Sequence, residues 1–310
     1  MKKVLFFMGK GGVGKTTISS SVAFQLSRKG YKVLIVSLDP AHNLGDVFYC
    51  HLENEKSSLA PDLDGIEIDL GKWVKKYLHD SKNEIRDTYR YNIGINIDSY
   101  MSILKYSPGT EEYAVLWAIE HIYETWHSKY DYIIFDTPPT ALTLRFLAMP
   151  SISMMWINEL KNMRERILEK RGTVLKLNPD AAVIKGASDK KDDAVFGKLG
   201  SIRERLKKLH LIFSRESYMT IVMNHDELSL SESSRILKEL AKLDVTINSI
   251  CLNKANPDIK INDNIKNKLE NFPLFPAFLL PEGLIRREDL GRIQIADLVD
   301  NIIETTRGNK

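Results

Sequence analysis

The chain has 310 residues, of which 43% are hydrophobic, so it is long and apolar enough for one large α/β domain or two smaller ones. Lysine and arginine number 44 against 41 for aspartate and glutamate, and this net charge of +3 is too balanced to indicate a nucleic-acid partner. No stretch approaches the ~20 apolar residues of a membrane span, and two cysteines are too few for a disulfide framework, so we expect a cytoplasmic protein without a span.

The first predicted element is a buried parallel strand, Val4–Met8, which leaves no room for a signal peptide ahead of it. A glycine-rich segment with the sequence GKGGVGKTT, Gly9–Thr17, follows, and a helical pattern then runs from Thr16 to Gly30. The segment matches G-x-x-x-x-G-K-[ST], the phosphate-binding loop of nucleoside triphosphatases, and stands between a strand and a helix as that loop requires. The sequence therefore predicts a nucleotide site here.

The residue types in this loop suit a phosphate chain and a magnesium ion. Glycines let backbone N–H groups converge on an anion, and the helix N-terminus adds partial positive charge. We expect Lys15 to reach the β- and γ-phosphates, the Thr16 hydroxyl to bind Mg²⁺, and Thr17 to hold the α-phosphate side. The second lysine, Lys10, suggests that hydrolysis needs two copies of the chain. The predicted nucleotide-binding residues of the loop are Gly11, Gly12, Val13, Gly14, Lys15, Thr16 and Thr17.

The second predicted strand, Lys32–Ser37, leads into Asp39 and Pro40. An acid at the carboxyl end of a parallel strand lies on the ligand side of the sheet. We therefore expect Asp39 to lie by the metal and to orient or deprotonate the water that attacks the γ-phosphate. Asp46 is an alternative for this role, or a cap of the next helix, and a turn aspartate without chemistry is the other interpretation of Asp39.

Further strands are predicted at Gly65–Leu70 and Tyr132–Asp136. The second ends in Asp136 after an apolar run, the Walker B arrangement in which the carboxylate holds Mg²⁺. The loop Thr137–Thr140 then lies where a γ-phosphate sensor must be, although its two prolines also fit a plain rigid turn.

Two long helical stretches, about 72–128 and 150–213, interrupt the strands and predict an inserted helical subdomain. They include helices at Glu112–Trp126 and Ile152–Lys170. Between Arg171 and Gly200 the residues are polar and small, which favours a mobile connection or lid, or else a surface loop.

The last strands are predicted at Thr220–Asn224, Ile247–Asn253 and Phe275–Leu280. The Asn253 side chain offers a donor and an acceptor that suit the adenine edge, and Pro281 belongs to a proline-marked loop that could cover the base. The whole pattern predicts an α/β fold in a single P-loop ATPase domain, residues 1–310, with a doubly wound, mostly parallel sheet and the inserted helical subdomain.

Over nearly the whole chain, these motifs resemble those of the ArsA-type family of P-loop ATPases, of the deviant Walker A class. Members of that family drive arsenical pumps or guide tail-anchored proteins to membranes. The resemblance implies hydrolysis of ATP with Mg²⁺, and it implies that Lys10 crosses a dimer interface to the partner's nucleotide. It also implies that Asp39 polarises the attacking water and that Asn253 binds adenine. The motifs are Gly9–Thr17, Ser37–Asp46, Pro108–Glu112, Asp136–Pro150, Ser229–Glu232 and Asn253.

The chain also departs from the family pattern. Ala141 and Leu142 replace the Gly and His of switch II, so the coupling of hydrolysis to closure can differ. No C-x-x-C is present, and we expect no intersubunit zinc of the kind found in eukaryotic tail-anchor ATPases. Cys50 and Cys251 are too few for an arsenite-binding cysteine cluster. Because there is one P-loop, two active sites require a homodimer.

Methionines gather around Trp156, and methionine surfaces suit varied apolar helices. The resemblance implies that this region helps form a client groove across the dimer; ordinary core packing is the alternative. We therefore expect a nucleotide-gated homodimer that captures and releases a hydrophobic client helix, such as that of a tail-anchored membrane protein, or that meets a membrane receptor. The alternative is the motor ATPase of an arsenite or other anion pump. The candidate groove residues are Met149, Met154, Met155 and Met163.

Overall fold

One sheet forms the frame of the molecule. The computed structural model describes residues 3–40, 44–88, 105, 107–178, 189–256, 261–278, 283 and 286–307. In this part of the chain, eight strands form a sheet in the order β3-β4-β2-β5-β1-β6-β7-β8, and each neighbouring pair is parallel except β3 and β4. The strands are β1 (Val4–Met8), β2 (Val33–Ser37), β3 (Ser57–Ala60), β4 (Leu63–Glu67), β5 (Tyr132–Asp136), β6 (Ser217–Asn224), β7 (Ser249–Asn253) and β8 (Leu274–Pro276).

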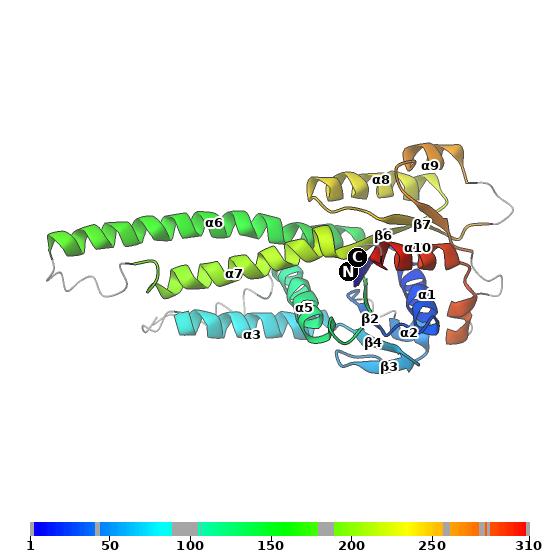
Figure 1. The fold of residues 1–310 in the computed structure, drawn as a ribbon, viewed down its shortest axis with the longest axis horizontal. Coiled ribbons are helices and arrows are strands. Elements are labelled where there is room, and N and C mark those ends of the chain that lie inside the picture. The colour runs from blue at the N-terminus through cyan, green and yellow to red at the C-terminus, as the bar shows by residue number, and fades with distance from the viewer. Residues whose placement is uncertain are drawn as a thin grey trace.

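Helices cover both faces of this sheet (Figure 1). The apolar side chains of β1 alternate between two cores, with Phe6 on one face and Phe7 on the other, because successive strand residues point to opposite sides. The α/β fold with a doubly wound, mostly parallel sheet is thus confirmed. The helices are α1 (Lys15–Arg28), α2 (Leu44–Phe48), α3 (Leu70–Thr88), α5 (Thr110–Trp126), α6 (Thr140–Leu177), α7 (Ala194–Leu211), η1 (Ile212–Glu216), α8 (Glu227–Lys242), α9 (Asp263–Lys268), η2 (Arg287–Arg292) and α10 (Ala296–Arg307).

The register of the central strands fixes the position of the site. Asp136 of β5 pairs with Phe7 of β1 on one side and with Ser37 of β2 on the other. The carboxyl ends of these three strands therefore lie level, and the loops that follow them meet at one edge of the sheet. That edge is where parallel α/β sheets bind their ligands.

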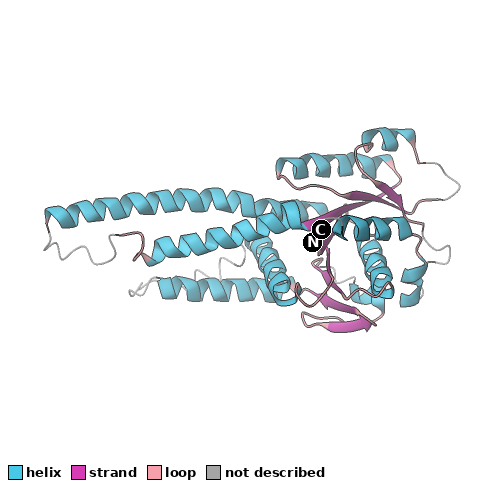
Figure 2. Cartoon of the chain, in the orientation of Figure 1, coloured by secondary structure: helices cyan, strands magenta, loops and turns pink. Residues whose placement is uncertain are grey.

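Three helices, α3, α6 and α7, extend away from the sheet, and α5 lies at their base (Figures 1 and 2). The strands are confined to the other end of the molecule. These helices occupy the stretches where the inserted helical subdomain is predicted, and its treatment as a separate subdomain stays a prediction. By length and composition alone, α6 could cross a membrane, and 28% of its most apolar window is buried. The prediction that no stretch approaches the apolar length of a membrane span therefore missed the apolar window of α6.

The prediction of a connection or lid from Arg171 to Gly200 is wrong at both ends, where the structure has helix instead. Helix α6 continues to Leu177 and α7 begins at Ala194, while residues 179–188 lie outside the described part. The α7 start is fixed by Asp193, whose carboxylate accepts a hydrogen bond from the Phe196 N–H at 2.7 Å. Polar composition alone suggested a loop, but the buried residues of α6 end at Leu168, and the helix continues to Leu177 with its side chains exposed or half-buried.

Strand boundaries differ from prediction both inside the sheet, where β6 begins at Ser217 rather than Thr220, and at its edge, where β3 was not predicted. Strand β3 is short, only partly buried and antiparallel, so it lacks the continuous apolar run of the central strands. Strand β4 ends at Glu67 rather than Leu70, because the Asp69 carboxylate accepts a hydrogen bond from the Lys72 N–H at 3.0 Å at the start of α3.

Candidate active site

The loop between β1 and α1 takes a shape that only glycine allows. Gly9, Gly12 and Gly14 have φ values of 151°, 79° and 89°. A Cβ on Gly9 would lie 2.2 Å from the Val222 carbonyl oxygen, and one on Gly14 would lie 2.3 Å from the Asn253 amide nitrogen. A Cβ on Gly12 would meet nothing within 4 Å. The loop therefore packs its backbone tightly against β6 and β7 while its other side stays open.

Lys15 lies at the first turn of α1 and is buried. Its ammonium group donates to the Lys10 carbonyl oxygen at 3.3 Å, so the side chain folds back over the loop. Burial lowers the pKa of this ammonium group, and the carboxylates of Asp136 and Asp39 oppose that effect. The three charged side chains thus act on one another at the edge of the sheet.

Asp136 is fully buried, and its two oxygens differ. Oδ2 accepts a hydrogen bond from the Thr16 hydroxyl at 2.6 Å, whereas Oδ1 has no partner among the described residues. Burial raises the pKa of Asp136 to about 7, against the lowering effects of Thr16 and Lys15. A buried carboxylate oxygen without a partner beside a threonine hydroxyl fits the oxygen ligands that Mg²⁺ prefers. The residues present therefore fit the expected magnesium ion.

Asp39 is buried two residues beyond the end of β2, and its N–H approaches the Ser37 hydroxyl at 3.4 Å. Asp39 and Asp136 both lie at the carboxyl ends of neighbouring strands, β2 and β5, and the negative charge of Asp39 adds to the effect of burial in raising the pKa of Asp136. Asp46 lies in the first turn of α2, where an acid suits the positive end of the helix.

The loop after β5 is tied down at both ends. The Thr137 hydroxyl donates to the Phe7 carbonyl oxygen at 2.9 Å, and the Thr143 hydroxyl donates to the Pro138 carbonyl oxygen at 2.7 Å. Helix α6 begins immediately after Pro139, so Ala141 and Leu142 lie in its first turn. The loop that was predicted to sense the γ-phosphate is therefore continuous with the longest helix of the described chain.

Asn253 is buried at the end of β7 and contacts the loop directly. Its amide donates to the Val13 carbonyl oxygen at 2.7 Å, and its oxygen accepts from the Lys254 N–H at 2.9 Å. Asn224 pairs with it at the end of β6 and has a buried amide oxygen without a partner among the described residues. The sequence analysis missed Asn224, although a polar residue that ends an apolar strand was the available signal. Pro281 lies outside the described residues.

Lys10 points away from this cluster. Its ammonium group pairs with Glu232 of α8 at 3.4 Å, and each side chain is 36% exposed. A cavity of about 530 Å³ lies beside the pair, between the start of α6 and α8. Gly11, Pro139 and Thr140 also line it. The face next to the P-loop is thus hollow and accessible.

The predicted groove methionines divide into two groups. Met149 and Met154 are half-buried, and Met149 packs against the core. Met155 and Met163 are 71% and 58% exposed. Only the second pair presents its side chains to solvent.

A family model for anion-transporting ATPases matches residues 2–271. The chain belongs to this family. A putative arsenical pump-driving ATPase of Aquifex aeolicus is 32% identical to it over 268 residues, which cover 86% of this chain and 85% of the relative. The ATPase GET3 of Mycosarcoma maydis is 31% identical over 262 residues, which cover 81% and 72% of the two chains. An ATPase ASNA1 homolog of Entamoeba dispar is 28% identical over 272 residues, or 86% and 80%.

Membership of the anion-transporting ATPase family confirms the predicted enzyme class, an ATPase. The family match begins at residue 2 and so includes the glycine-rich loop, Asp39, Asp136 and Asn253. ATP is the nucleotide that this family hydrolyses, and the loop geometry fits its phosphate chain.

Proposed function

We propose that this ATPase works as a homodimer with Mg²⁺ and uses its nucleotide cycle to capture and release a hydrophobic helix of a client protein. The observation that carries the proposal is the exposed apolar surface of α6. Eight of the ten large hydrophobic side chains that are exposed in the described chain belong to this one helix. Single exposed apolar residues are ordinary on proteins, but a concentration of this kind marks an interaction surface.

The spacing of these side chains favours a helical partner. Most of them follow intervals of four and three residues, with Lys170 as the one charged interruption. Such a seam is the face that one helix presents to another in a coiled coil. Its side chains are Trp156, Leu160, Met163, Ile167, Val174 and Leu177, and we name it the α6 seam.

The same helix supports a physical link between nucleotide and client. Helix α6 has 38 residues and is about 57 Å long, since each residue adds about 1.5 Å. Its first turn follows the loop after Asp136, and Arg145 in the second turn pairs with the buried Glu112 of α5 at 3.0 Å. A change in the loop would therefore move the seam through a continuous rod. Pro150 is the one proline inside it, and it removes a hydrogen-bond donor from the helix there.

In the nucleotide site we assign the loop amides and Lys15 to the phosphate chain, and Asp39 to the orientation of the attacking water. Thr16 and Asp136 would hold Mg²⁺, which would neutralise charge on the phosphates when it is bound. Two observations support this assignment: Lys15, Asp39 and Asp136 are buried and act on one another electrostatically, and Oδ1 of Asp136 has no hydrogen-bond partner among the described residues. Hydrolysis then depends on positioning rather than on covalent chemistry by the protein.

Lys10 supports the dimer. It is not required to hold Lys15 or Asp136 in place, since its side chain pairs with Glu232 at the rim of an open cavity. We propose that this lysine leaves Glu232 when two chains meet over their nucleotides. Light scattering with Mg-ADP and a phosphate mimic should show the mass of a dimer for the wild type and of a monomer for Lys10→Ala. A wild-type mass that stays monomeric would contradict the dimer.

Capture of an apolar helix tests the proposed function. The purified protein should keep a peptide with a hydrophobic tail-anchor segment in solution, and the double variant Leu160→Asp, Met163→Asp should lose that capacity. Leu228→Asp, at an exposed leucine on α8, is the matched control and should retain it. Equal capture by all three proteins would sink the client proposal while leaving the ATPase assignment intact.

The pump-motor alternative draws on the names of the arsenical pump-driving relatives. The described thiols give it little support, because burial in β7 raises the pKa of Cys251 to about 12 and Cys50 lies exposed at the end of α2. We expect arsenite to leave the ATPase rate unchanged. Stimulation that disappears in Cys251→Ser would favour the pump motor instead.

A further inference from the structure

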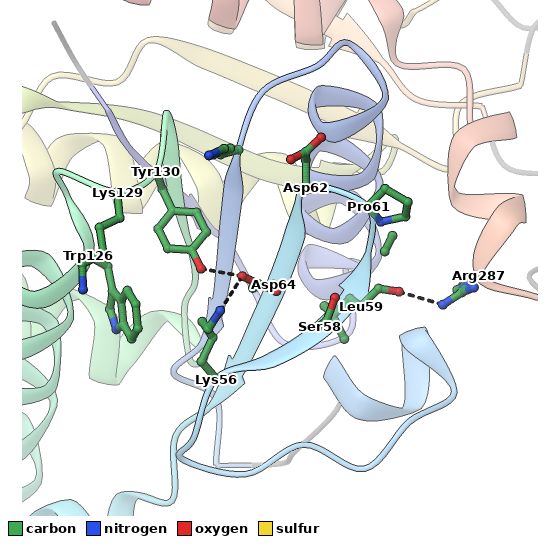
Figure 3. A pocket seen from close by; sticks show the side chains of 12 residues that line it. Lys56, Ser58, Leu59, Pro61, Asp62, Asp64, Trp126, Lys129, Tyr130 and Arg287 are labelled. Atoms are coloured by element: carbon green, nitrogen blue, oxygen red, sulfur yellow. Dashed lines mark hydrogen bonds and ion pairs between the residues drawn. The ribbon is translucent and has the colours of Figure 1, made fainter.

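A second cavity, of about 700 Å³, lies at the opposite edge of the sheet from the nucleotide site (Figure 3). Its lining residues Lys32, Asp62 and Tyr130 come just before strands β2, β4 and β5, whereas the P-loop and Asp136 lie at carboxyl ends of strands. The two cavities are therefore on opposite ends of the parallel strands. Nothing in the proposed nucleotide chemistry uses this one.

Among the lining residues, basic side chains outnumber acidic ones by four to two. Lys32, Lys56, Lys129 and Arg287 face only two carboxylates, Asp62 and Asp64. The carboxylate of Asp64 already has two partners within the cavity. It accepts a hydrogen bond from the Tyr130 hydroxyl at 2.5 Å and pairs with Lys56 at 2.9 Å (Figure 3).

Two of the cations remain open to a ligand. The ammonium groups of Lys32 and Lys129 have no carboxylate partner among the described residues, and both side chains are exposed. Lys129 lies over the Trp126 ring, 4.5 Å from its centroid. Arg287, on the opposite wall in Figure 3, pairs with Glu288 and donates to the Leu59 carbonyl oxygen at 2.7 Å.

The combination of residue types is that of a protein-recognition surface. Tryptophan, tyrosine and arginine dominate the energy of protein interfaces, and here Trp126 and Tyr130 contact each other with ring centroids 5.9 Å apart. Lys56 is paired with Asp64 and Arg287 with Glu288, so the positive charge that favours an acidic occupant is that of Lys32 and Lys129. The cations come from four separate segments rather than from one compact cradle, so an extended ligand that carries several carboxylates fits them better than a small anion does.

We propose that this cavity, which we name the basic cleft, binds an acidic peptide segment of a partner protein. Side chains rather than strand addition would recognise it, because Arg287 occupies the Leu59 carbonyl oxygen on the edge strand β3. The excess of cations provides affinity and attraction over distance, and Trp126 with Tyr130 provides an apolar wall.

A fluorescein-labelled peptide of alternating glutamate and serine is the probe, and its anisotropy is measured against the full-length protein. We expect Lys32→Glu with Lys129→Glu to weaken binding by about tenfold or more, because two attractive contacts become repulsive. The double variant Lys266→Glu, Lys268→Glu on α9 changes the net charge equally at exposed positions and should stay within about twofold.

Three outcomes would overturn the proposal: no peptide binding, equal losses in both double variants, or displacement of the peptide by citrate at equal concentration, which would indicate a small-anion site. Unchanged melting temperatures confirm that the variants fold. ATPase activity should be the same in all of these variants. A negative result in the peptide assay would therefore overturn the basic cleft without affecting the proposed client function.

Discussion

Replacement of Asn253 by alanine tests whether the phosphate-binding loop depends on a side chain from β7. The amide of Asn253 donates to the Val13 carbonyl oxygen at 2.7 Å, and both residues are buried. Gly14, next in the loop, packs so closely on Asn253 that even a methyl group would clash with it. The structure therefore gives Asn253 a role in holding the loop, beside the contact with adenine that the family resemblance implies.

The expected size of the effect follows from the lost hydrogen bond. Alanine leaves the Val13 carbonyl oxygen buried and without its partner, which costs about 1–3 kcal/mol. If that cost falls on the loop shape that binds phosphate, affinity drops by about tenfold to a hundredfold, since about 1.4 kcal/mol corresponds to a factor of ten. The loss should be the same for ATP and for inorganic triphosphate, because the loop contacts phosphate and not the base.

Calorimetric titration of the wild type and Asn253→Ala with Mg-ATP and with Mg-triphosphate separates the two roles. Asn267→Ala on α9, at an exposed position, is the control and should bind both ligands as the wild type does. A loss confined to ATP would refute the loop-holding role and assign Asn253 to adenine alone. No loss for either ligand would refute both roles.

Three further predictions concern the site and the α6–α7 pair. Thr16→Ala should abolish the increase in nucleotide affinity on adding Mg²⁺, while affinity in EDTA changes by less than about twofold; an intact Mg²⁺ response would remove Thr16 from the metal site. Gly14→Ala should weaken nucleotide binding more than Gly12→Ala does in the same titration, because both have φ values near 80–90° but only Gly14 has a neighbour in the way; equal losses would contradict this. Arg164 lowers the pKa of Asp193, so Asp193 contributes stability that is present above its pKa in the unfolded chain and is lost as pH falls through its folded pKa. Urea unfolding should show Asp193→Asn less stable by about 1–3 kcal/mol near neutral pH and a shrinking difference in acid; a difference that does not depend on pH would contradict the ion pair.

The central strands and the loop could be predicted from sequence because their signals are local. Strands β1 and β5 have the predicted bounds, since each is an apolar run that is buried on both faces; β1 is followed by a glycine and β5 ends in an acid. The Thr16–Asp136 contact joins residues 120 positions apart, yet each was identified separately from its place after a strand. Strand order then brings them together without further information.

Other features depend on contacts that no local pattern reveals. The hydrogen bond from Asn253 to Val13 joins residues 240 positions apart and reaches a backbone atom, which any residue type could supply. Helix α6 continues past Arg171 although no residue from Arg171 to Leu177 is buried, and its tie to the start of α7, the Arg164–Asp193 pair, lies earlier in the helix. Polar composition there indicated a loop, because a helix end that buries no side chain needs no apolar stripe.

The arrangement of α6 also changes the significance of the altered switch II. With Ala141 and Leu142 in place of Gly and His, the first turn of α6 has no titratable side chain at those positions, and the Thr143 hydroxyl holds the turn to the Pro138 carbonyl oxygen instead. A movement of that loop therefore reaches α6 through backbone and a single hydroxyl. A rotation of about 5° at one end of a rod about 57 Å long displaces the other end by about 5 Å, one helical turn. Because the α6 seam lies on this rod, a small change at the phosphate loop would, in the proposed cycle, shift an apolar surface relative to a partner helix without a switch II histidine.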